Sequence, residues 1–456
     1  MARVRGHASW AKPTPLASAT HHPPHIAIAS GGGLGFNAGR MSTPARIQEL
    51  TALEILDSRG RPTVQATCRL DNGVVTRASV PSGASTGKAE ALELRDGDPG
   101  RYRGLGCRRA VANVREIIHP ALAGRVLDSQ AGLDNTLLEL DGTPNKSRLG
   151  ANAILAVSVA CARAVARHQR MPLYRHLAEL AGETPRLPRL TINLFSGGKH
   201  AGSQAPLQDV LVVPSSAHGI DQALSVTFAV YQAAAELASR KYGMRLLRAD
   251  EGGLAPPFPN SQSMLEDAEE AIQLAGFQPG RNVSLAVDVA SSQFYSDECY
   301  HLDGKPLDGS AMIDQLERWV DRYPLVSLED GLAEEDWRFW PELTRRLKRR
   351  CLVLGDDFLC TNPARIRKAV EANAANALLL KVNQIGTLTE ALEALRLARG
   401  AGWHVTISAR SGETEDDWLA DLAVGWRGDD IKIGSITQSE RLSKYNRLLA
   451  IEKELA

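Results

Sequence analysis

The sequence predicts an α/β protein in which an N-terminal α+β domain precedes an eight-stranded α/β barrel. The first observation is length, because 456 residues exceed one small domain and an α/β barrel takes about 250 of them. The second is a series of short apolar runs in the second half, each of which ends on a polar residue. The third is the first half, where hairpin and helix patterns replace this repeat.

Composition excludes several classes of protein. A hydrophobic content of 43% and a charged content of 23% are typical of a soluble globular protein. Lysine plus arginine equals aspartate plus glutamate at 53 each, so no net charge attracts nucleic acid or an anionic membrane. No apolar stretch is long enough to cross a bilayer, and the six cysteines form no CxxC pair. We therefore expect a cytoplasmic protein with reduced thiols and with neither a nucleic-acid nor a membrane partner.

Residues 1–45 differ from the rest of the chain. They contain several prolines and a glycine run, and the first acidic residue is Glu49. Such a segment has little to bury, so we predict a disordered extension. It is either a transit peptide or an upstream extension of the reading frame with Met41 as the start. The prolines and glycines are unfavourable in the amphipathic helix of a transit peptide and favour the second account.

Residues 46–181 are expected to form the α+β domain. Two strand-like runs flank Asp71-Asn72-Gly73, which predicts a hairpin because asparagine and glycine accept positive φ. The small-residue segment 81–91, PSGASTGKAEA, has no apolar anchor and is expected to be a mobile loop. Apolar spacing over 151–167 predicts a buried helix. Residues 182–189 are a linker to the second domain.

Residues 190–456 are expected to form the barrel. Six apolar runs end 22 to 41 residues apart, which leaves room for a strand, a helix and two loops, as a parallel sheet requires. Two further runs, at 189–195 and 211–214, bring the number of strands to eight. An open doubly wound sheet would need a glycine-rich phosphate loop after its first strand, and neither half has one. Active sites of such barrels lie at the carboxyl ends of the strands, where the six runs place Asp288, Glu329, Asp356, Lys381, Arg410 and Lys432.

Three of these end residues are carboxylates. A single acid at such a place is usually a helix cap or a solvated loop residue. Three on nearby strands would repel one another unless a cation neutralised them, and oxygen ligands select a hard ion such as Mg²⁺. Asp288, Glu329 and Asp356 are therefore candidate metal ligands.

The basic end residues suggest chemistry beside that metal. Lys381 and Lys432 would point among the acids, and a lysine in a desolvated, cation-rich pocket has a lowered pKa and can act as a base. Arg410 offers a planar donor for phosphate or carboxylate. Glu251, in the turn DEGG, adds another acid, whereas His200, in a glycine-rich loop, would by itself be an ordinary structural residue.

Nine motifs, taken together and in order, resemble the enolase family. They are ILDSRGRPTVQA, PSGASTG, ELRDGD, GANAILAVS, VSLEDGLAEEDW, LLLKVNQIGTLTEAL, RSGETED, DLAVG and SERLSKYNRLLAIE, and they span roughly 47–453. The resemblance implies that the N-terminal domain caps a modified eight-stranded barrel, usually in a homodimer. It also implies a glycolytic, Mg²⁺-dependent lyase that removes the α-proton of 2-phosphoglycerate and eliminates water to give phosphoenolpyruvate.

The resemblance also implies a role for individual residues. Asp288, Glu329 and Asp356 would hold one Mg²⁺, and Ser85 of the mobile loop would complete a second site, giving two ions per active site. Lys381 would be the base, Lys432 a cation on the substrate carboxylate, and Glu251 the acid at the leaving hydroxyl, with Asp209 as its partner. The expected substrate-binding residues are His200, Gln208, Arg410 and Ser411.

The chain departs from the family pattern at several positions. Ala409 stands where the family has a histidine, and Asp209 replaces a glutamate. Lys199 and Arg248 add cations near these positions, and Gln65 replaces another glutamate. Three functions remain open: a slow enzyme for 2-phosphoglycerate, an enzyme like carboxyphosphonoenolpyruvate synthase of phosphonate biosynthesis, or a non-catalytic paralogue. Retention of both lysines and all three metal-binding acids counts against the last.

Overall fold

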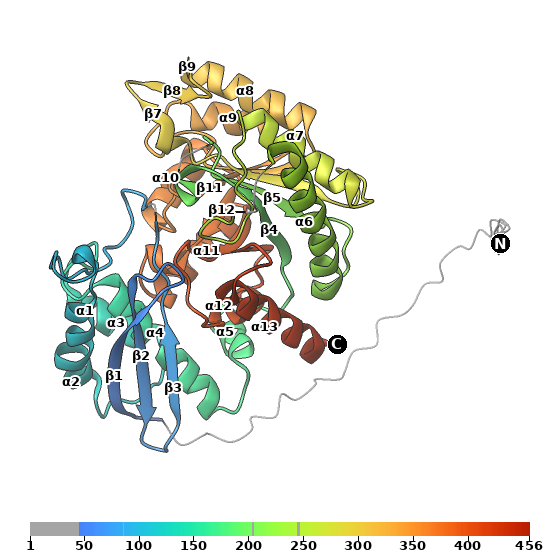
Figure 1. Ribbon diagram of the computed structural model, residues 1–456. Helices are drawn as coiled ribbons and strands as arrows, with labels where there is room; N and C mark the ends of the chain where they lie inside the picture. Colours follow the sequence, from blue (N-terminus) through green and yellow to red (C-terminus); the bar gives the residue numbers. More distant parts are fainter. Residues whose placement is uncertain (1–44, 85, 203–204, 244–246) are drawn as a thin grey trace, which may run out of the picture. The chain divides into compact units, whose positions relative to one another are not determined.

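The computed structural model describes residues 45–84, 86–202, 205–243 and 247–456 (Figure 1). These residues belong to one compact unit. The predicted extension at 1–45 lies, except for Ala45, outside the described residues, as does Ser85.

The N-terminal part begins with an antiparallel sheet of three strands, β1 (Ile47–Leu56), β2 (Pro62–Leu70) and β3 (Val75–Ser79). Arg69 of β2 pairs with Val75 of β3, so the predicted hairpin is confirmed. Gly73 in its turn has a φ of 86°, a conformation that favours glycine.

Helices follow this sheet along the chain. One of them, α4, contacts β2 and β3 and is buried continuously from Ala151 to Ala162, which confirms the predicted buried helix. Alanine at many of its positions allows the sheet to approach closely. The elements of this part are η1 (Tyr102–Gly104), α1 (Arg108–Asn113), η2 (Val114–Ile118), α2 (His119–Leu122), α3 (Gln130–Asp141), α4 (Ala151–His168) and α5 (Leu173–Ala181).

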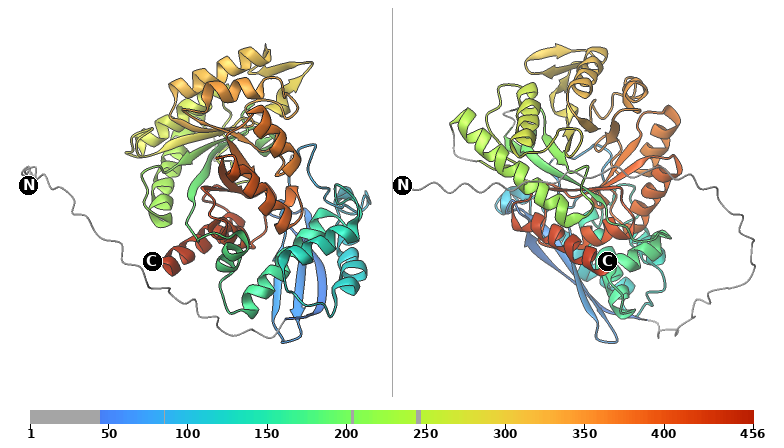
Figure 2. Two further views of the ribbon diagram at one scale, coloured as in Figure 1. Left: turned by 180° about the vertical axis from the view of Figure 1, so that it is seen from behind. Right: turned by 90° about the vertical axis from the view of Figure 1, so that its right-hand side faces the viewer.

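The C-terminal part is a closed barrel of eight strands, as the sequence predicts. In barrel order the strands are β10 (Leu325–Glu329), β11 (Leu352–Gly355), β12 (Ala377–Leu380), β13 (His404–Ser408), β14 (Asp430–Gly434), β4 (Arg189–Ser196), β5 (Asp209–Val213) and β6 (Ser284–Asp288). Helices surround the barrel (Figure 2).

One strand runs against the direction that a fully parallel barrel requires. β5 is antiparallel to both β4 and β6, whereas the other neighbouring pairs are parallel. Among its described residues, the connection from β4 to β5 has η3 (Gly198–Ala201) as its one helical element. That connection is too short for a crossover helix, so β5 returns beside β4 as in a hairpin.

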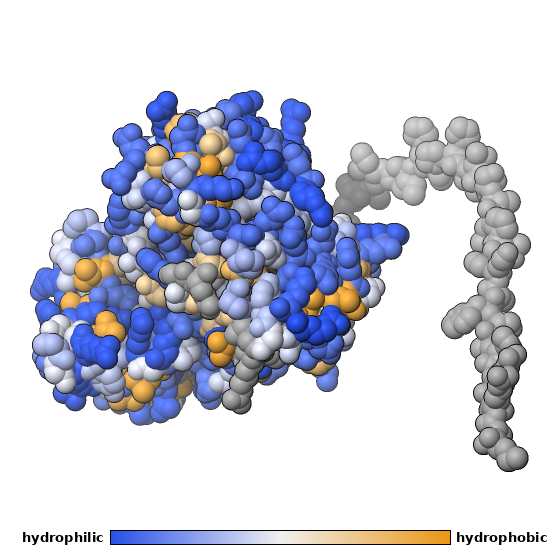
Figure 3. Space-filling model, turned by 45° about the horizontal axis from the view of Figure 1, so that its top comes forward, coloured by the Kyte–Doolittle hydropathy of each residue, from blue (hydrophilic) through white to orange (hydrophobic). Residues whose placement is uncertain are grey.

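The remaining elements lie around the barrel. They are α6 (Ile220–Tyr242), α7 (Ser261–Leu274), η4 (Ser291–Phe294), β7 (Tyr295–Ser296), β8 (Cys299–Leu302), β9 (Lys305–Leu307), α8 (Gly309–Arg322), α9 (Trp340–Leu347), α10 (Pro363–Ala372), η5 (Val382–Gln384), α11 (Leu388–Gly400), α12 (Trp418–Gly425) and α13 (Ser439–Leu455). Within the described part of the chain, none of the helices has the length and apolar character needed to cross a membrane. The face shown in Figure 3 is largely hydrophilic, with scattered apolar groups.

The N-terminal helices dock on the amino end of α11. The Asp134 carboxylate of α3 accepts hydrogen bonds from the backbone N–H of Thr389, at 2.9 Å, and from its hydroxyl, at 2.6 Å. Lys146 forms an ion pair with Glu390, with Nζ and Oε1 2.6 Å apart. Because the first N–H groups of a helix have no partner inside the helix, these contacts satisfy α11 and fix the two parts together.

This docking predicts a pH dependence of stability. Burial raises the pKa of Asp134 to about 6, from an ordinary value of 3.8. The folded protein therefore keeps this proton at pH values where the unfolded chain has released it, so the contribution of Asp134 to stability falls as pH rises from about 4 to 6. At about 1.4 kcal/mol per pKa unit, the loss is on the order of 3 kcal/mol.

Asp134→Asn removes this titration. The free energy of unfolding, measured in urea, should fall in the wild type between pH 4 and pH 7 but not in the variant. The difference between the two proteins should therefore shift in favour of Asp134→Asn by about 3 kcal/mol. The exposed Asp128→Asn of the same part is the control. An equal difference between Asp134→Asn and wild type at both pH values would show that Asp134 does not titrate in this range.

Candidate active site

Three carboxylates gather at the carboxyl ends of adjacent strands. Asp288 is the last residue of β6, Glu329 is the last of β10, and Asp356 directly follows β11. Glu329 and Asp288 lie opposite each other in the strand register. All three side chains are buried. The structure thus brings the predicted metal ligands to one edge of the barrel.

Two lysines lie among these acids. The ammonium group of Lys432, on β14, is 3.0 Å from Asp288 Oδ2 and 2.7 Å from Glu329 Oε2. The ammonium group of Lys381, directly after β12, forms an ion pair with Asp356. Both cations are therefore held by carboxylates that the sequence assigns to metal binding.

The pKa of Lys381 differs from the sequence-based expectation. Burial acts to lower the pKa, but the Asp356 carboxylate beside the amine outweighs it, so the pKa of Lys381 is raised. The expected lowering assumed a pocket rich in cations, whereas the immediate neighbour of Lys381 is an acid. For Lys432, burial is likewise outweighed by Asp288 and Glu329, and its pKa is raised well above the usual value.

The donor set fits a hard divalent cation. One oxygen of Glu329, Oε2, bonds to Lys432, while the other, Oε1, is buried without a hydrogen-bond partner. Burial and the nearby Asp288 charge also raise the pKa of Glu329 well above its ordinary value. A buried carboxylate oxygen without a partner is costly, and an ion with oxygen ligands such as Mg²⁺ would satisfy it.

The spacing of ligand atoms is not that of a closed site formed by these three acids. Among the described residues, ligand atoms lie within 4.8 Å of one another in two groups: His200, Asp209 and Glu251, and Asp330, Asp356 and Asp357. Of the three predicted ligands, Asp288, Glu329 and Asp356, only Asp356 belongs to one of these groups. Lys432 bonds to both Asp288 and Glu329, so its ammonium group occupies the space between two of the predicted ligands.

On the antiparallel side of the barrel, His200 joins two acids. Its Nδ1 is 3.0 Å from Asp209 Oδ2, and its Nε2 is 3.9 Å from Glu251 Oε1. The Ser196 hydroxyl donates to the other oxygen of Asp209 at 2.5 Å. Asp209 is therefore held by His200 and Ser196, whereas the family resemblance implied Glu251 as its partner. The aspartate side chain, one methylene shorter, bonds to the nearer imidazole.

These contacts set the charges of the group. Burial acts to lower the pKa of His200, but Asp209 and Glu251 outweigh it and raise the pKa to about 9. Burial acts in the opposite sense on Glu251, where the His200 charge outweighs it and lowers the pKa to about 2. At neutral pH the pair is therefore an imidazolium beside a carboxylate.

Sequence reasoning missed two polar residues of β4. The Asn193 amide donates to Glu251 Oε2 at 2.9 Å, and Ser196 holds Asp209. Both side chains are buried in an otherwise apolar strand, TINLFS. Polar residues inside such a run would have been the signal, because a buried polar side chain needs a partner.

Two basic side chains of α13 form hydrogen bonds with the backbone of the loop from Ala409 to Asp417. Arg441 donates to the carbonyls of Arg410 and Ser411 at 2.7 Å, and Lys444 donates at 2.7 Å to the carbonyls of Thr414 and Asp416. Both cations are buried. They satisfy carbonyls that no strand or helix pairs, and so give the loop one conformation.

Of the other predicted residues, Ala409 and Ser411 lie in this loop, and Gln208 directly precedes β5. Ala409 is buried, and its N–H donates to the Lys432 carbonyl at 2.9 Å. The Ser411 hydroxyl accepts from Arg59 at 3.1 Å, and Gln208 donates to Asp288 at 2.9 Å. Lys199 and Arg248, the two additional cations, are exposed. Ser85, the predicted ligand of a second ion, lies outside the described residues.

Two family models match the chain. The model for the enolase N-terminal domain covers residues 47–177, and the model for the enolase C-terminal TIM barrel domain covers residues 184–456. The second match alone spans more than half of the chain, and it contains the carboxyl ends of all eight barrel strands. The matches support a lyase of the enolase superfamily. The chain belongs to the enolase family.

Proposed function

We propose that the protein catalyses Mg²⁺-dependent elimination of water from 2-phosphoglycerate, giving phosphoenolpyruvate. The main support is the joint position of the buried acids Asp288, Glu329 and Asp356 with Lys381 and Lys432 at one barrel edge. We further propose two Mg²⁺ ions per site, a cytoplasmic location and a homodimer, all of which rest on family membership.

Asp288, Glu329 and Asp356 would hold one ion, and Ser85 is proposed to complete a second site. When bound, Mg²⁺ would stabilise the negative charge that develops on the substrate carboxylate as the α-proton leaves. The buried Glu329 Oε1, which lacks a hydrogen-bond partner, supports this assignment.

Lys381 is the proposed base. A base must first lose its own proton, and the ion pair with Asp356 favours the protonated amine. A cation bound to Asp356 would weaken this ion pair, and Lys381 would then lose its proton more easily. Lys432 keeps its proton and places a fixed positive charge beside the substrate carboxylate.

Departure of the 3-hydroxyl needs a proton from the opposite wall of the pocket. Glu251 is ionised, and the imidazolium of His200 lies 3.9 Å from it. We assign proton delivery to this pair, with Asn193 and Asp209 holding its two members in place. Arg410, Ser411 and Gln208 are the proposed contacts of the substrate anion.

A second candidate is a reaction like that of carboxyphosphonoenolpyruvate synthase. The observation that favours it is the buried methyl group of Ala409 beside Lys432, where the family has an imidazole. A substrate with an additional carboxylate on phosphorus would fill that volume. The two substrates can be separated experimentally.

The metal assignment predicts loss of activity when one ligand is removed. Asp288→Ala should abolish turnover, because two acids then remain without a complete ligand set. Calorimetry should detect Mg²⁺ binding to the wild type and much weaker binding to the variant. Asp297→Ala, an exposed acid outside the barrel mouth, should match the wild type. Full activity of metal-free protein would refute the assignment.

Removal of the α-proton and departure of the 3-hydroxyl can be tested separately with two variants. Lys381→Ala should stop exchange of the substrate α-proton with solvent deuterium, because no base remains. Glu251→Gln should retain exchange and lose dehydration. NMR of 2-phosphoglycerate in deuterated buffer measures the first step, and formation of phosphoenolpyruvate measures the second. Wild-type exchange by Lys381→Ala would exclude this lysine as the base.

The Ala409 site predicts which substrate is native. If it is 2-phosphoglycerate, Ala409→His combined with Asp209→Glu should raise kcat/KM, since acid–base assistance is worth about 10² to 10⁴-fold. If the native substrate carries an additional anionic group, the same change should exclude it sterically. Both substrates are assayed with wild type and double variant. No gain on the first and no loss on the second would make Ala409 a neutral substitution.

A further inference from the structure

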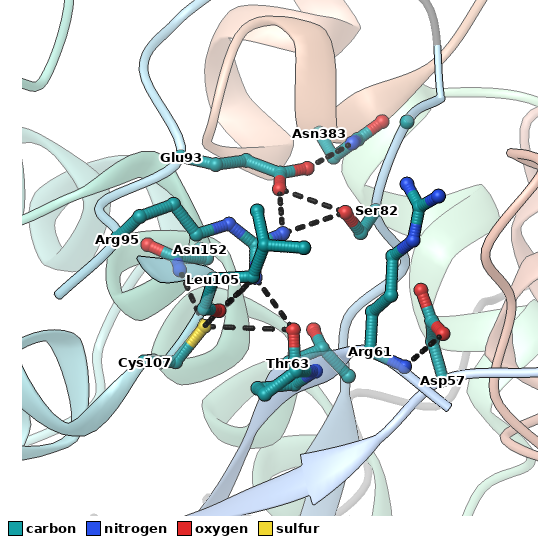
Figure 4. Close-up of polar contacts among 12 residues, drawn as sticks. Asp57, Arg61, Thr63, Ser82, Glu93, Arg95, Leu105, Cys107, Asn152 and Asn383 are labelled. Atoms are coloured by element: carbon teal, nitrogen blue, oxygen red, sulfur yellow. Dashed lines mark hydrogen bonds and ion pairs between the residues drawn. The ribbon is translucent and has the colours of Figure 1, made fainter. Parts of the chain in front are cut away.

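A segment of the N-terminal part, residues 82–84 and 86–95, reaches the mouth of the barrel. Ser82 exchanges two backbone hydrogen bonds with Gly412, at 2.8 and 3.0 Å, and Ala91 donates to the Gln384 carbonyl at 2.7 Å. The segment is thus fixed to the barrel near both ends. Figure 4 shows Ser82, Glu93 and Arg95 of this segment together with Asn383 of the barrel.

Glu90 of this segment binds Arg410 of the barrel. Its two oxygens lie 3.0 and 3.1 Å from the two terminal nitrogens of the guanidinium group, so the pair is bidentate. The same carboxylate accepts the N–H of Gly87 at 3.1 Å. Both side chains are more than nine-tenths buried, with 7% of Glu90 and 3% of Arg410 exposed.

A second carboxylate, that of Glu93, is connected to Arg410 through Asn383. Arg410 donates to Asn383 Oδ1 at 3.0 Å, and the Asn383 amide donates to Glu93 Oε1 at 3.4 Å. Ser82 and Arg95 hold the other oxygen of Glu93 at 2.9 and 2.6 Å (Figure 4). Glu90 and Glu93 therefore have different tasks, although they lie three residues apart.

We propose that Glu90 is the positioning residue of the anion subsite: it holds the Arg410 guanidinium in one orientation and offsets part of its charge. This inference rests on the proposed function, which places the substrate phosphate at Arg410. Two parallel hydrogen bonds fix both the plane and the rotation of a guanidinium group, which a single contact does not. The carboxylate also repels an incoming anion, so Arg410 binds phosphate less tightly than it would without Glu90.

The two effects act in opposite directions when the charge of Glu90 is removed. Glu90→Gln keeps the length of the side chain and loses the negative charge. Inorganic phosphate should then bind roughly tenfold more tightly, because a nearby like charge is gone. Turnover should fall roughly 10²-fold, because the guanidinium group no longer holds the substrate in the productive geometry. A purely structural role would weaken both.

The test uses the full-length protein with Mg²⁺ and inorganic phosphate as the probe. Calorimetry gives the phosphate Kd, and steady-state assays on 2-phosphoglycerate give kcat, for wild type, Glu90→Gln, Arg410→Gln and the double variant. Glu90→Gln should tighten phosphate binding in the wild-type background. It should tighten phosphate binding much less when Arg410 is already glutamine, because only the direct repulsion between Glu90 and phosphate then remains and no guanidinium charge is left for Glu90 to offset.

Glu93→Gln is the matched control. It lies in the same segment and is paired with an arginine, Arg95, and it is linked to Arg410 through Asn383. Its phosphate Kd should change much less than that of Glu90→Gln, because its negative charge is already paired with Arg95, even if its melting temperature falls. Melting temperatures of all variants confirm folding.

The outcomes separate this inference from the proposed function. Weaker phosphate binding by Glu90→Gln, an unchanged Kd, or the same tightening in Glu93→Gln would each overturn the positioning role. If wild type binds phosphate with the predicted non-additive pattern but neither exchanges nor dehydrates 2-phosphoglycerate, the proposed function fails and the role of Glu90 in the anion subsite stands.

Discussion

Charges at the barrel mouth are largely buried, so they have to be neutralised mainly by one another. Asp288 and Glu329 share the ammonium group of Lys432, Asp356 holds Lys381, and Glu90 holds Arg410. An unpaired charge in such a place would cost several kcal/mol. Each ion pair therefore constrains the strand ends that carry it, and the geometry of the site follows from this requirement.

The same requirement extends to the surrounding loops. Arg441 and Lys444 of α13 lie under the loop after β13 and donate to its carbonyls. From the other side, Ser82 of the N-terminal part pairs with Gly412 of that loop. The loop that carries Arg410 is thus held by α13 and by the N-terminal part. The N-terminal part therefore contributes to the candidate site through Ser82 and Glu90.

Several features could be predicted from the sequence because they depend on local patterns. Apolar runs that end on a polar residue mark strand ends, and on this basis Asp288, Glu329 and Asp356 were placed correctly at the barrel edge. The pattern does not give the direction of a strand, so the reversal of β5 was missed. It also gives no distances between side chains. Asp209 bonds to an imidazole in the preceding connection, and the partner of Glu90 lies 320 residues away. Neither contact produces a periodic pattern in the sequence.

The reversal of β5 also affects the order in which the contacts of the candidate site can form during folding. His200, in η3, and Asp209, the first residue of β5, are nine residues apart in the sequence, and the reversal brings them into contact. Closing so small a loop costs little entropy, so this pair can form as soon as β4 and β5 meet. The contact between Glu90 and Arg410 has to wait until both parts of the chain have folded and docked. The contact between His200 and Asp209 can therefore form early in folding, and the contact between Glu90 and Arg410 forms later.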